Sequence, residues 1–441
     1  MSKRVVITAL GTLGDLNPLL ALAVGLRARG HEVVIATGEG FHDLVVDLDL
    51  RFHPIAPHAI PSEFLTPSDD PDVDTANLIR DLLFPQIRQS YDDLRAAAGG
   101  ADLLVTQMLS FAGPIVAATT GIPWVSAVFQ PLAFFSHFDP FVLLNPLAPP
   151  GVIEVDETTH RRMWRLGWQT VHSWAEPIRE LRLELGAPPG SNPIFEDHHS
   201  PDLVLAMFSP TLGARRPDWP AQTRVTGFAF DDGLIAGSAL PPGLPEFLDA
   251  GAPPVVFTLG SHAPFDTGEF FAKSIEAALL LGCRAVLLGA GAPALLARRN
   301  LPASVARNLV AFDYAPYAAA FPRAAVVVHH GGIGTIALAM RAGRPMLLVP
   351  CGFDQPDNSV RAARLGSARI VAQPHYTPVR AAGEVWRLLS DPRLTLAARA
   401  LQRDLAGEDG AASACDALEA YMRVPRVSVM TGAPPVGAVS W

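Results

Sequence analysis

A glycine-rich turn is the segment of the sequence best suited to do chemistry. It spans residues 329–335, with the sequence HHGGIGT, between an apolar run and a stretch with helical spacing. Glycines such as Gly332 and Gly334 let the backbone approach a phosphate closely, and the free N–H groups of a helix N-terminus attract negative charge. His330 and Thr335 add two side-chain donors. The turn predicts a phosphate-binding site, and a tight strand-to-helix turn without a ligand is the alternative.

Four further residues suited to ligand binding stand directly after neighbouring apolar runs. Asp354 and Gln355 carry groups that suit hydrogen bonds to sugar hydroxyls. Tyr314 offers an aromatic face for a nucleobase, and Ser261 offers a hydroxyl for a phosphate. Because parallel strands end at the same edge of a sheet, we expect these residues to face one cleft with the glycine-rich turn.

The elements that must position these residues alternate between short apolar runs and helical stretches, which is typical of parallel βαβ units. The predicted strands are 4–10, 32–36, 102–106, 124–129, 203–207, 255–259, 284–288, 309–312, 325–329 and 346–349. The predicted helices are 18–29, 77–98, 112–120, 159–185, 267–281, 332–342, 355–365 and a helical region from 378 to about 422. Pro18 is expected to open the first helix, because proline is favoured at the first helical position.

Prolines divide the chain into two α/β halves. Eight of them gather between residues 209 and 254, which is typical of a linker. We expect an N-terminal Rossmann-like domain over 1–210, a linker over 211–254 and a C-terminal domain over 255–405. A C-terminal helix over 406–423 is expected to return to the N-terminal domain, followed by a loose tail over 424–441. The predicted fold class is α/β, with two parallel-sheet domains facing each other across a cleft.

Composition excludes several classes of function. The net charge is −9 and the only lysines are Lys3 and Lys273, so no basic run is present to follow a phosphate backbone, and nucleic acid is not an expected partner. Three scattered cysteines indicate neither a disulfide framework nor a zinc site. No apolar run reaches the roughly 20 residues of a membrane span. We expect a cytoplasmic protein.

The motifs between residues 314 and 358 resemble the signature of the family 1 glycosyltransferases. They are aromatic-x-Pro at 314–316, His-x-Gly-x-Gly-Thr at 330–335, Gly-x-Pro at 343–345 and Asp-Gln-x-x-Asn at 354–358. The turn after the first strand, Gly-x-x-Gly-Asp-x-x-Pro at 11–18, resembles the bacterial branch. The chain is also similar to the rhamnosyltransferases that build rhamnolipids and to related natural-product enzymes.

This resemblance implies the GT-B fold and assigns roles to the motif residues. Tyr314 would stack on the base, and His330 with Thr335 would hold the diphosphate. Asp354 and Gln355 would hold the sugar. Gly332, Gly334, Ser261 and Thr12 are counted with the donor-binding residues. The donor domain would be the C-terminal one, and the acceptor would bind the N-terminal one.

One departure from the family bears on the donor. Plant members carry a glutamate that binds the ribose diol, and the matching position here is Leu338. A deoxyribose donor tolerates the loss of that ligand. We therefore expect a dTDP-sugar, dTDP-L-rhamnose first, and UDP-glucose otherwise.

Asp15 is the expected catalytic base. Plant members use a histidine after the first strand, and Asp15 occupies that place here. An inverting transfer needs a group that takes the proton of the acceptor hydroxyl. The alternative is an aspartate that only caps the first helix and complements its dipole.

Aromatic residues in the N-terminal half predict a hydrophobic acceptor such as a flavonoid, polyketide or hydroxy-lipid. They gather near the ends of predicted strands, although such residues are more often ordinary core. The expected acceptor-binding residues are Met108, Phe111, Phe129, Phe134, Phe135 and Phe138.

No metal and no cofactor are expected. Asp-x-Asp triplets, the pattern of metal-dependent transferases, occur at 47–49, 70–72 and 72–74. The first falls in a helical stretch and the others in a proline-rich loop, so we interpret them as solvated surface.

These observations favour an inverting, metal-independent glycosyltransferase that moves a sugar from a nucleotide to a hydroxyl of a hydrophobic small molecule. A nucleotide-sugar 2-epimerase would need several ring-facing carboxylates. A Rossmann oxidoreductase would need a third glycine in the turn at 11–16. A catalytically silent auxiliary protein of the same fold would be expected to lose the base or the donor motif, and both are present.

Overall fold

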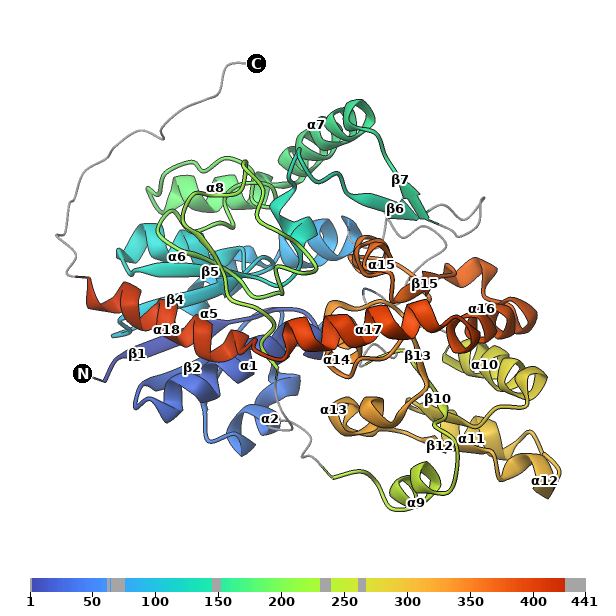
Figure 1. The fold of residues 1–441 in the computed structure, drawn as a ribbon. Helices are drawn as coiled ribbons and strands as arrows, with labels where there is room; N and C mark the ends of the chain where they lie inside the picture. The colour runs from blue at the N-terminus through green and yellow to red at the C-terminus, as the bar shows by residue number, and fades with distance from the viewer. Residues whose placement is uncertain are drawn as a thin grey trace.

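The computed structural model describes residues 2–61, 64, 76–144, 152–230, 239–260 and 267–424, and it contains two parallel sheets flanked by helices (Figure 1). No helix in these ranges is both long and apolar enough to cross a membrane. The predicted fold class, two parallel-sheet α/β domains, is confirmed.

The central strands of the N-terminal sheet are apolar, buried runs, as expected where helices cover both faces, whereas its two edge strands are partly exposed. Its strands are β1 (Arg4–Thr8), β2 (Glu32–Thr37), β3 (Arg51–Pro54), β4 (Leu103–Gln107), β5 (Trp124–Val128), β8 (Val204–Ala206) and β9 (Thr223–Val225). The order is β3-β2-β1-β4-β5-β8-β9, and every neighbouring pair is parallel. Its helices are α1 (Leu13–Ala28), α2 (His42–Asp47), α5 (Ile87–Ala97), α6 (Ala112–Thr120), α7 (Glu157–Trp174) and α8 (Glu176–Glu184).

The C-terminal sheet repeats this plan. Its strands are β10 (Val255–Thr258), β11 (Ala285–Leu288), β12 (Leu309–Phe312), β13 (Val326–His329), β14 (Met346–Leu348) and β15 (Ala368–Ile370). The order is β12-β11-β10-β13-β14-β15, all parallel. The helices from the linker onwards are α9 (Leu244–Asp249), α10 (Thr267–Leu281), α11 (Ala292–Ala297), α12 (Ala303–Ala306), α13 (Tyr317–Ala320), α14 (Ile333–Arg341), α15 (Gln355–Arg364), α16 (Pro378–Ser390), α17 (Pro392–Leu405) and α18 (Gly410–Arg423).

Both strand orders reverse direction at one point, between β1 and β4 in the first sheet and between β10 and β13 in the second. Open α/β sheets bind ligands at such switch points, beyond the carboxyl ends of the strands. The turn with Asp15 follows β1, and the glycine-rich turn follows β13. The topology therefore places both predicted reactive segments where ligands bind in this class of fold.

The predicted linker is not a bare connection. It contributes β9 to the N-terminal sheet and α9 to the C-terminal half. Trp219 and Phe228 are buried in a hydrophobic cluster that holds side chains from both sheets. A short antiparallel hairpin, β6 (Val142–Leu144) and β7 (Val152–Glu154), projects from the N-terminal half.

Several boundaries differ from the sequence-based prediction. The predicted helix 77–98 is a π-helical segment over Leu78–Leu83 followed, after a turn, by α5. Pro18 lies inside α1 rather than at its start, because Thr12 and Asp15 form a capping box that begins the helix at Leu13. The predicted helix 159–185 is two helices, and α8 begins with Glu176 and Pro177. The helical region 378–422 is three helices, because Pro392 opens α17 and the side chain of Asp409 caps α18.

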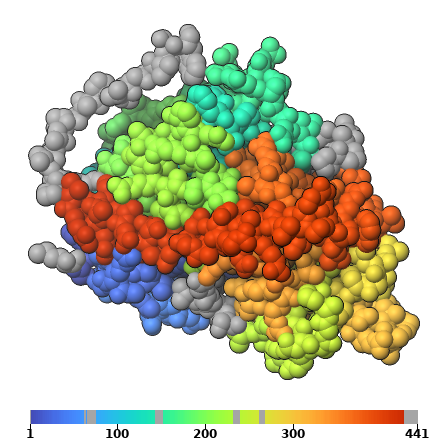
Figure 2. Space-filling view, in the orientation of Figure 1, coloured from blue at the N-terminus to red at the C-terminus, as the bar shows by residue number. Residues whose placement is uncertain are grey.

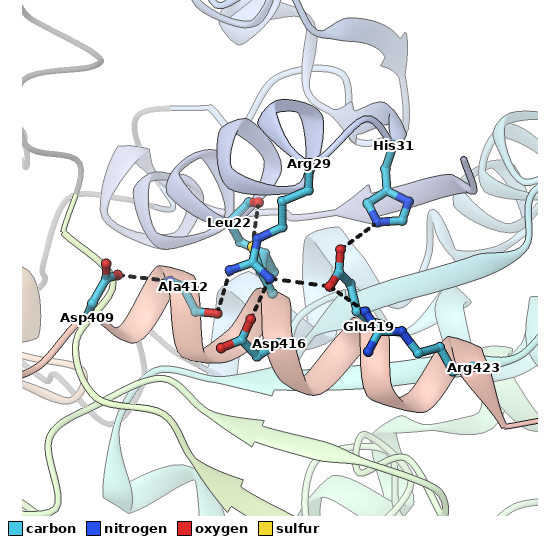
Figure 3. Close-up of polar contacts among 9 residues, drawn as sticks. Leu22, Arg29, His31, Asp409, Ala412, Asp416, Glu419 and Arg423 are labelled. Carbon is cyan, nitrogen blue, oxygen red and sulfur yellow. Dashed lines mark hydrogen bonds and ion pairs between the residues drawn. The ribbon is translucent and has the colours of Figure 1, made fainter. Parts of the chain in front are cut away.

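The last helix, α18, lies against α1 of the N-terminal half, after α17 has crossed the molecule (Figure 2). The two helices approach closely because Gly25 has no side chain: a Cβ there would lie 2.9 Å from the sulfur of Cys415. Figure 3 shows Arg29 reaching Asp416, with the guanidinium 2.5 Å from its carboxylate, and His31 reaching Glu419 at 3.2 Å.

Candidate active site

The turn between β1 and α1 holds Asp15 by its own backbone. The Thr12 N–H donates to Asp15 Oδ2 at 2.8 Å, and the Thr12 hydroxyl lies 3.1 Å from the same oxygen. Gly11 has φ +124°, and a Cβ there would lie 2.4 Å from Asp15 Oδ2. The carboxylate is thus packed against a backbone position that only glycine fits. Asp15 caps the helix and is also only partly buried, so capping and catalysis are compatible roles.

The glycine-rich turn on the opposite sheet is more deeply buried. Gly331 has φ +90°, and Gly332 is the N-cap of α14. The His330 ring, 6% exposed, fills the space that side chains at two glycines would need: a Cβ on Gly260 or on Gly332 would lie within 2.5 Å of it. The histidine is therefore locked between the turns that follow β10 and β13.

His329 supports this turn from the last position of β13. Its Nδ1 accepts the Gly331 N–H at 3.2 Å, and the ring is fully buried. Burial lowers the pKa of His329 to about 3, so the ring is neutral and can accept. The sequence does not reveal this role, since a histidine that ends a strand carries no signal of which backbone group it contacts.

The third segment follows β14 and opens α15. Asn358 Nδ2 donates to Asp354 Oδ2 at 2.6 Å, one helical turn away. The Asn358 side chain is fully buried, and its spacing from Asp354 could have signalled the pair. The buried Gln355 turns its Oε1 inward, where it accepts the N–H groups of Cys351 at 2.9 Å and Gly352 at 3.3 Å. Gln355 thus shapes the turn that presents Asp354.

Two carboxylates from the two domains influence each other electrostatically. The pKa of Asp354 is raised to about 6, mainly by burial; the Asn358 hydrogen bond lowers it, and the negative charge of Asp15 raises it. Asp15, in the first turn of the helix after β1, is thus within electrostatic range of Asp354, which caps α15 of the second domain.

The remaining donor candidates belong to other turns of the C-terminal domain. Tyr314 is 53% exposed, and its ring centroid lies 6.2 Å from that of Tyr317. Tyr317 is itself anchored, with its hydroxyl 2.7 Å from that of Thr258. Thr335 is buried in the first turn of α14. Ser261 lies outside the described residues.

Comparison with known proteins decides the family. The chain is 34% identical to O-mycaminosyltylonolide 6-deoxyallosyltransferase of Streptomyces fradiae over 435 residues. This match covers 95% of this chain and 97% of the relative. The chain belongs to the bacterial family 1 glycosyltransferases. It is therefore an enzyme, as the motifs predicted.

Further similarities agree with this family. Residues 5–93 match the glycosyltransferase family 28 N-terminal domain, and residues 293–420 match the C-terminal domain of erythromycin biosynthesis protein CIII-like proteins. Glycosyltransferase GtfE of Amycolatopsis orientalis is 32% identical over 376 residues, which cover 82% of this chain and 84% of the relative. The solved glycosyltransferase of kitacinnamycin shares the fold, with a TM-score of 0.71, 21% identity and 95% and 99% of the two chains covered.

The predicted acceptor residues of this glycosyltransferase differ in how deeply they are buried, and three of them lie in the core. Phe111 is buried beside Phe84, with ring centroids 5.0 Å apart, and Phe129 lies in the core under β5. Phe134 stacks on Trp219 with centroids 4.0 Å apart.

The other three are less deeply buried. Phe135, with φ +46°, packs on Phe195. Met108 is partly buried, and its sulfur accepts a hydrogen bond from Gln130 Nε2 at 3.7 Å. Phe138 is 59% exposed. Their roles in acceptor binding stay predictions.

No group of three or more potential metal ligands occurs among the residues that the structure describes. Asp47 and Asp49 lie at the end of α2 and just beyond it, and Asp49 forms an ion pair with Arg27 at 3.1 Å. The triplets at 70–74 lie outside the described residues. The absence of a metal requirement stays a prediction.

Proposed function

We propose that this glycosyltransferase moves a 6-deoxyhexose, L-rhamnose first, from a dTDP donor to a hydroxyl of a hydrophobic small molecule, with inversion and without a metal. The observation that carries the proposal is the place of Asp15 and of the turn at 330–335 at the switch points of the two sheets. The electrostatic influence of Asp15 on Asp354 agrees with a proton acceptor from one domain facing the sugar-binding motif of the other.

Asp15 acts as the general base in this scheme. Its carboxylate takes the proton of the acceptor hydroxyl while that oxygen attacks the anomeric carbon. The bond from that carbon to the diphosphate oxygen breaks, and its electron pair leaves with the nucleotide. The two contacts from Thr12 hold the carboxylate in place, so little reorganisation is needed.

The departing diphosphate is stabilised by the turn at 330–335. The N-terminus of α14 points its free N–H groups at the site, with His330 and the Thr335 hydroxyl beside it. Such preorganised donors stabilise developing negative charge without a metal. Asp354, held by Asn358, binds sugar hydroxyls.

The choice of dTDP rests on Leu338 and on the relatives. Leu338 lies on α14 partly packed against the core, and its apolar side chain has no group to bind a ribose diol. The Streptomyces fradiae relative is named as a 6-deoxyallosyltransferase. The solved glycosyltransferase VinC has the same fold, with a TM-score of 0.66 and 23% identity, and the match covers 95% of this chain and 99% of VinC. Its structure was determined in complex with dTDP.

A thermal-shift titration with dTDP, UDP and GDP tests the donor. Binding to the folded state raises Tm, so dTDP is expected to give the largest shift. Leu338→Glu supplies the missing diol ligand and is expected to move the preference towards UDP. A wild-type preference for UDP would overturn the assignment of dTDP.

A transfer assay completes the test. We expect product from dTDP-L-rhamnose and a hydroxylated polyketide or flavonoid, with inverted anomeric configuration by NMR and no loss in EDTA. Nucleotide binding without transfer to any acceptor would instead favour a catalytically silent auxiliary protein.

A further inference from the structure

A buried cluster of three charged side chains joins the two halves beside the proposed site. Arg361 on α15 donates from Nη1 to Asp139 Oδ2 at 2.6 Å and from Nε to Asp357 Oδ2 at 2.6 Å. The exposed fraction of the side chain is 5% for Arg361, 7% for Asp139 and 1% for Asp357. Asp139 belongs to the N-terminal half, and Asp357 and Arg361 belong to the C-terminal half. The cluster is therefore an interdomain contact held by charge rather than by apolar packing.

On the donor side, the cluster shares a helix with the sugar-binding motif. The first turns of α15 carry two neighbouring pairs with the same spacing, Asp354 with Asn358 and Asp357 with Arg361. A helix is stiff over this length, so a force on Arg361 moves Asp354 as well. The position of the sugar-binding carboxylate thus depends on what Arg361 binds.

On the other side, Asp139 ends the aromatic loop 134–139. Ser136 donates to Asp218 Oδ1 at 2.6 Å, and the His137 N–H donates to Asp218 Oδ2 at 2.7 Å. The loop is fixed to the linker through Asp218 and, at 3.5 Å, through an ion pair of Asp139 with Arg216. It is fixed to α15 through Arg361, and the exposed Phe138 lies between these contacts. The same loop carries three of the predicted acceptor residues.

Stability alone is a poor reason for such a cluster. Buried ion pairs repay their desolvation only partly, and apolar side chains of similar volume often serve as well. The planar guanidinium of an arginine adds geometric specificity, because its N–H donors can bind two carboxylates at once in one fixed relative orientation.

We propose that Arg361 is a positioning residue, which couples the aromatic acceptor loop to the sugar-binding end of α15. This inference rests on the proposed function: the acceptor hydroxyl and the sugar are aligned only while Arg361 holds Asp139. Binding of the nucleotide part of the donor is expected to depend less on the contact, because the turn at 330–335 opens another helix, α14, and the hydrogen bond that links it to α15 is the long one from Asn358 Nδ2 to the Gly331 carbonyl, at 3.5 Å.

Transfer kinetics of Arg361→Met, Arg361→Lys and Asp139→Ala test the coupling. A misalignment of about 1 Å costs roughly a hundredfold in rate, so Arg361→Met is expected to lose about that factor in kcat/KM, with a much smaller change in Kd for dTDP. Arg361→Lys keeps the charge without the fork and is expected to recover only part of the loss. Asp139→Ala removes the acceptor of the Nη1 hydrogen bond and leaves the Asp357 pair intact.

Arg364→Met is the matched control. Arg364 lies on the same helix and pairs with Glu154 of β7 at 2.5 Å, but both side chains are about half exposed. Exposed pairs contribute little, so this variant is expected to keep wild-type transfer. Folded Arg361→Met or Asp139→Ala with wild-type kcat/KM would overturn the proposal, as would an equal loss in Arg364→Met.

Hydrogen exchange gives a readout that does not depend on activity. In Asp139→Ala, amides of α15 are expected to exchange faster although the substitution is in the other half. Exchange confined to the loop around 139 would overturn the coupling. If the wild-type protein transfers no sugar, the proposed function fails, and the exchange experiment still decides this inference.

Discussion

The donor side and the acceptor side of the site are built differently. On the donor side, His330, Gln355 and Asn358 are buried and held by the protein's own hydrogen bonds and packing. On the acceptor side, Asp15 lies on a partly exposed turn, and Phe138 is 59% exposed. The difference indicates a donor site formed in advance and an acceptor side with room for varied molecules.

The largest effect on turnover is expected at Asp15, on the more exposed acceptor side. Asp15→Asn keeps an oxygen that can accept the Thr12 N–H, so the fold and dTDP affinity should be retained. Loss of the base is expected to lower kcat by about 10²–10⁴-fold. Steady-state kinetics with a calorimetric Kd for dTDP measure both quantities. Turnover close to that of the wild type would return Asp15 to a capping role alone.

Two phenylalanines four residues apart sharpen the contrast between core and surface. Phe134→Ala removes the buried partner of Trp219 and is expected to cost about 3–5 kcal/mol of unfolding free energy. Phe138→Ala removes an exposed ring, so stability should be unchanged while KM for the acceptor rises. Urea denaturation and acceptor kinetics of the two variants give the comparison. Equal stability losses would mean that Phe138 is also part of the core.

The surroundings of the donor candidates follow from the sequence more directly than those of the acceptor candidates, for a physical reason. The turn at 330–335 and the pair at 354–355 are short continuous motifs, and parallel strands bring their ends together wherever helices alternate with strands. An aromatic type, by contrast, does not distinguish core from pocket, so Phe134 and Phe138 carried the same prediction. Nothing in the sequence pairs Asp139 with Arg361, because 222 positions separate them.

Side-chain direction was also beyond the sequence. The motif indicates that Gln355 binds sugar, but which way its oxygen turns depends on the backbone of residues 351–352. Pro18 was misplaced because the capping pair Thr12 and Asp15 outweighs the preference of proline for a first turn.

The pH dependence of stability tests how deeply the donor side is buried. The pKa of Asp354 is raised to about 6 from 3.8, so the folded state keeps a proton that the unfolded chain releases between these values. The free energy of unfolding therefore falls as pH rises from about 4 to 6 and is then level.

Asp354→Asn removes this dependence and is expected to be more stable than the wild type above pH 6, by at most roughly 3 kcal/mol. Thermal unfolding from pH 4.5 to 8, without nucleotide, measures the difference. Asp404→Asn, at an exposed position on α17, is the control and should follow the wild type. Parallel curves for all three proteins would mean that Asp354 is well solvated.

The smallest effect is expected from alanine substitution of a glycine at the proposed diphosphate site. Gly334 on α14 and Gly383 on α16 are both helical glycines, and a Cβ at either would meet nothing within 4 Å. Alanine should stabilise each helix slightly, by up to about 1 kcal/mol. Only Gly334→Ala is expected to weaken dTDP, by about tenfold, because it fills the approach of the diphosphate. Equal affinities of the two variants would place the diphosphate elsewhere.

The return of α18 to the first sheet has a consequence for protein engineering. A chimera that joins the acceptor half of this enzyme to the donor half of a relative by a single junction in the linker would also import a foreign last helix. That helix would have to fit against Gly25, where this chain places Cys415, and to supply carboxylates for Arg29 and His31. Domain exchange therefore needs two junctions, one near residue 240 and one between α17 and α18, so that the last helix stays with its native partner.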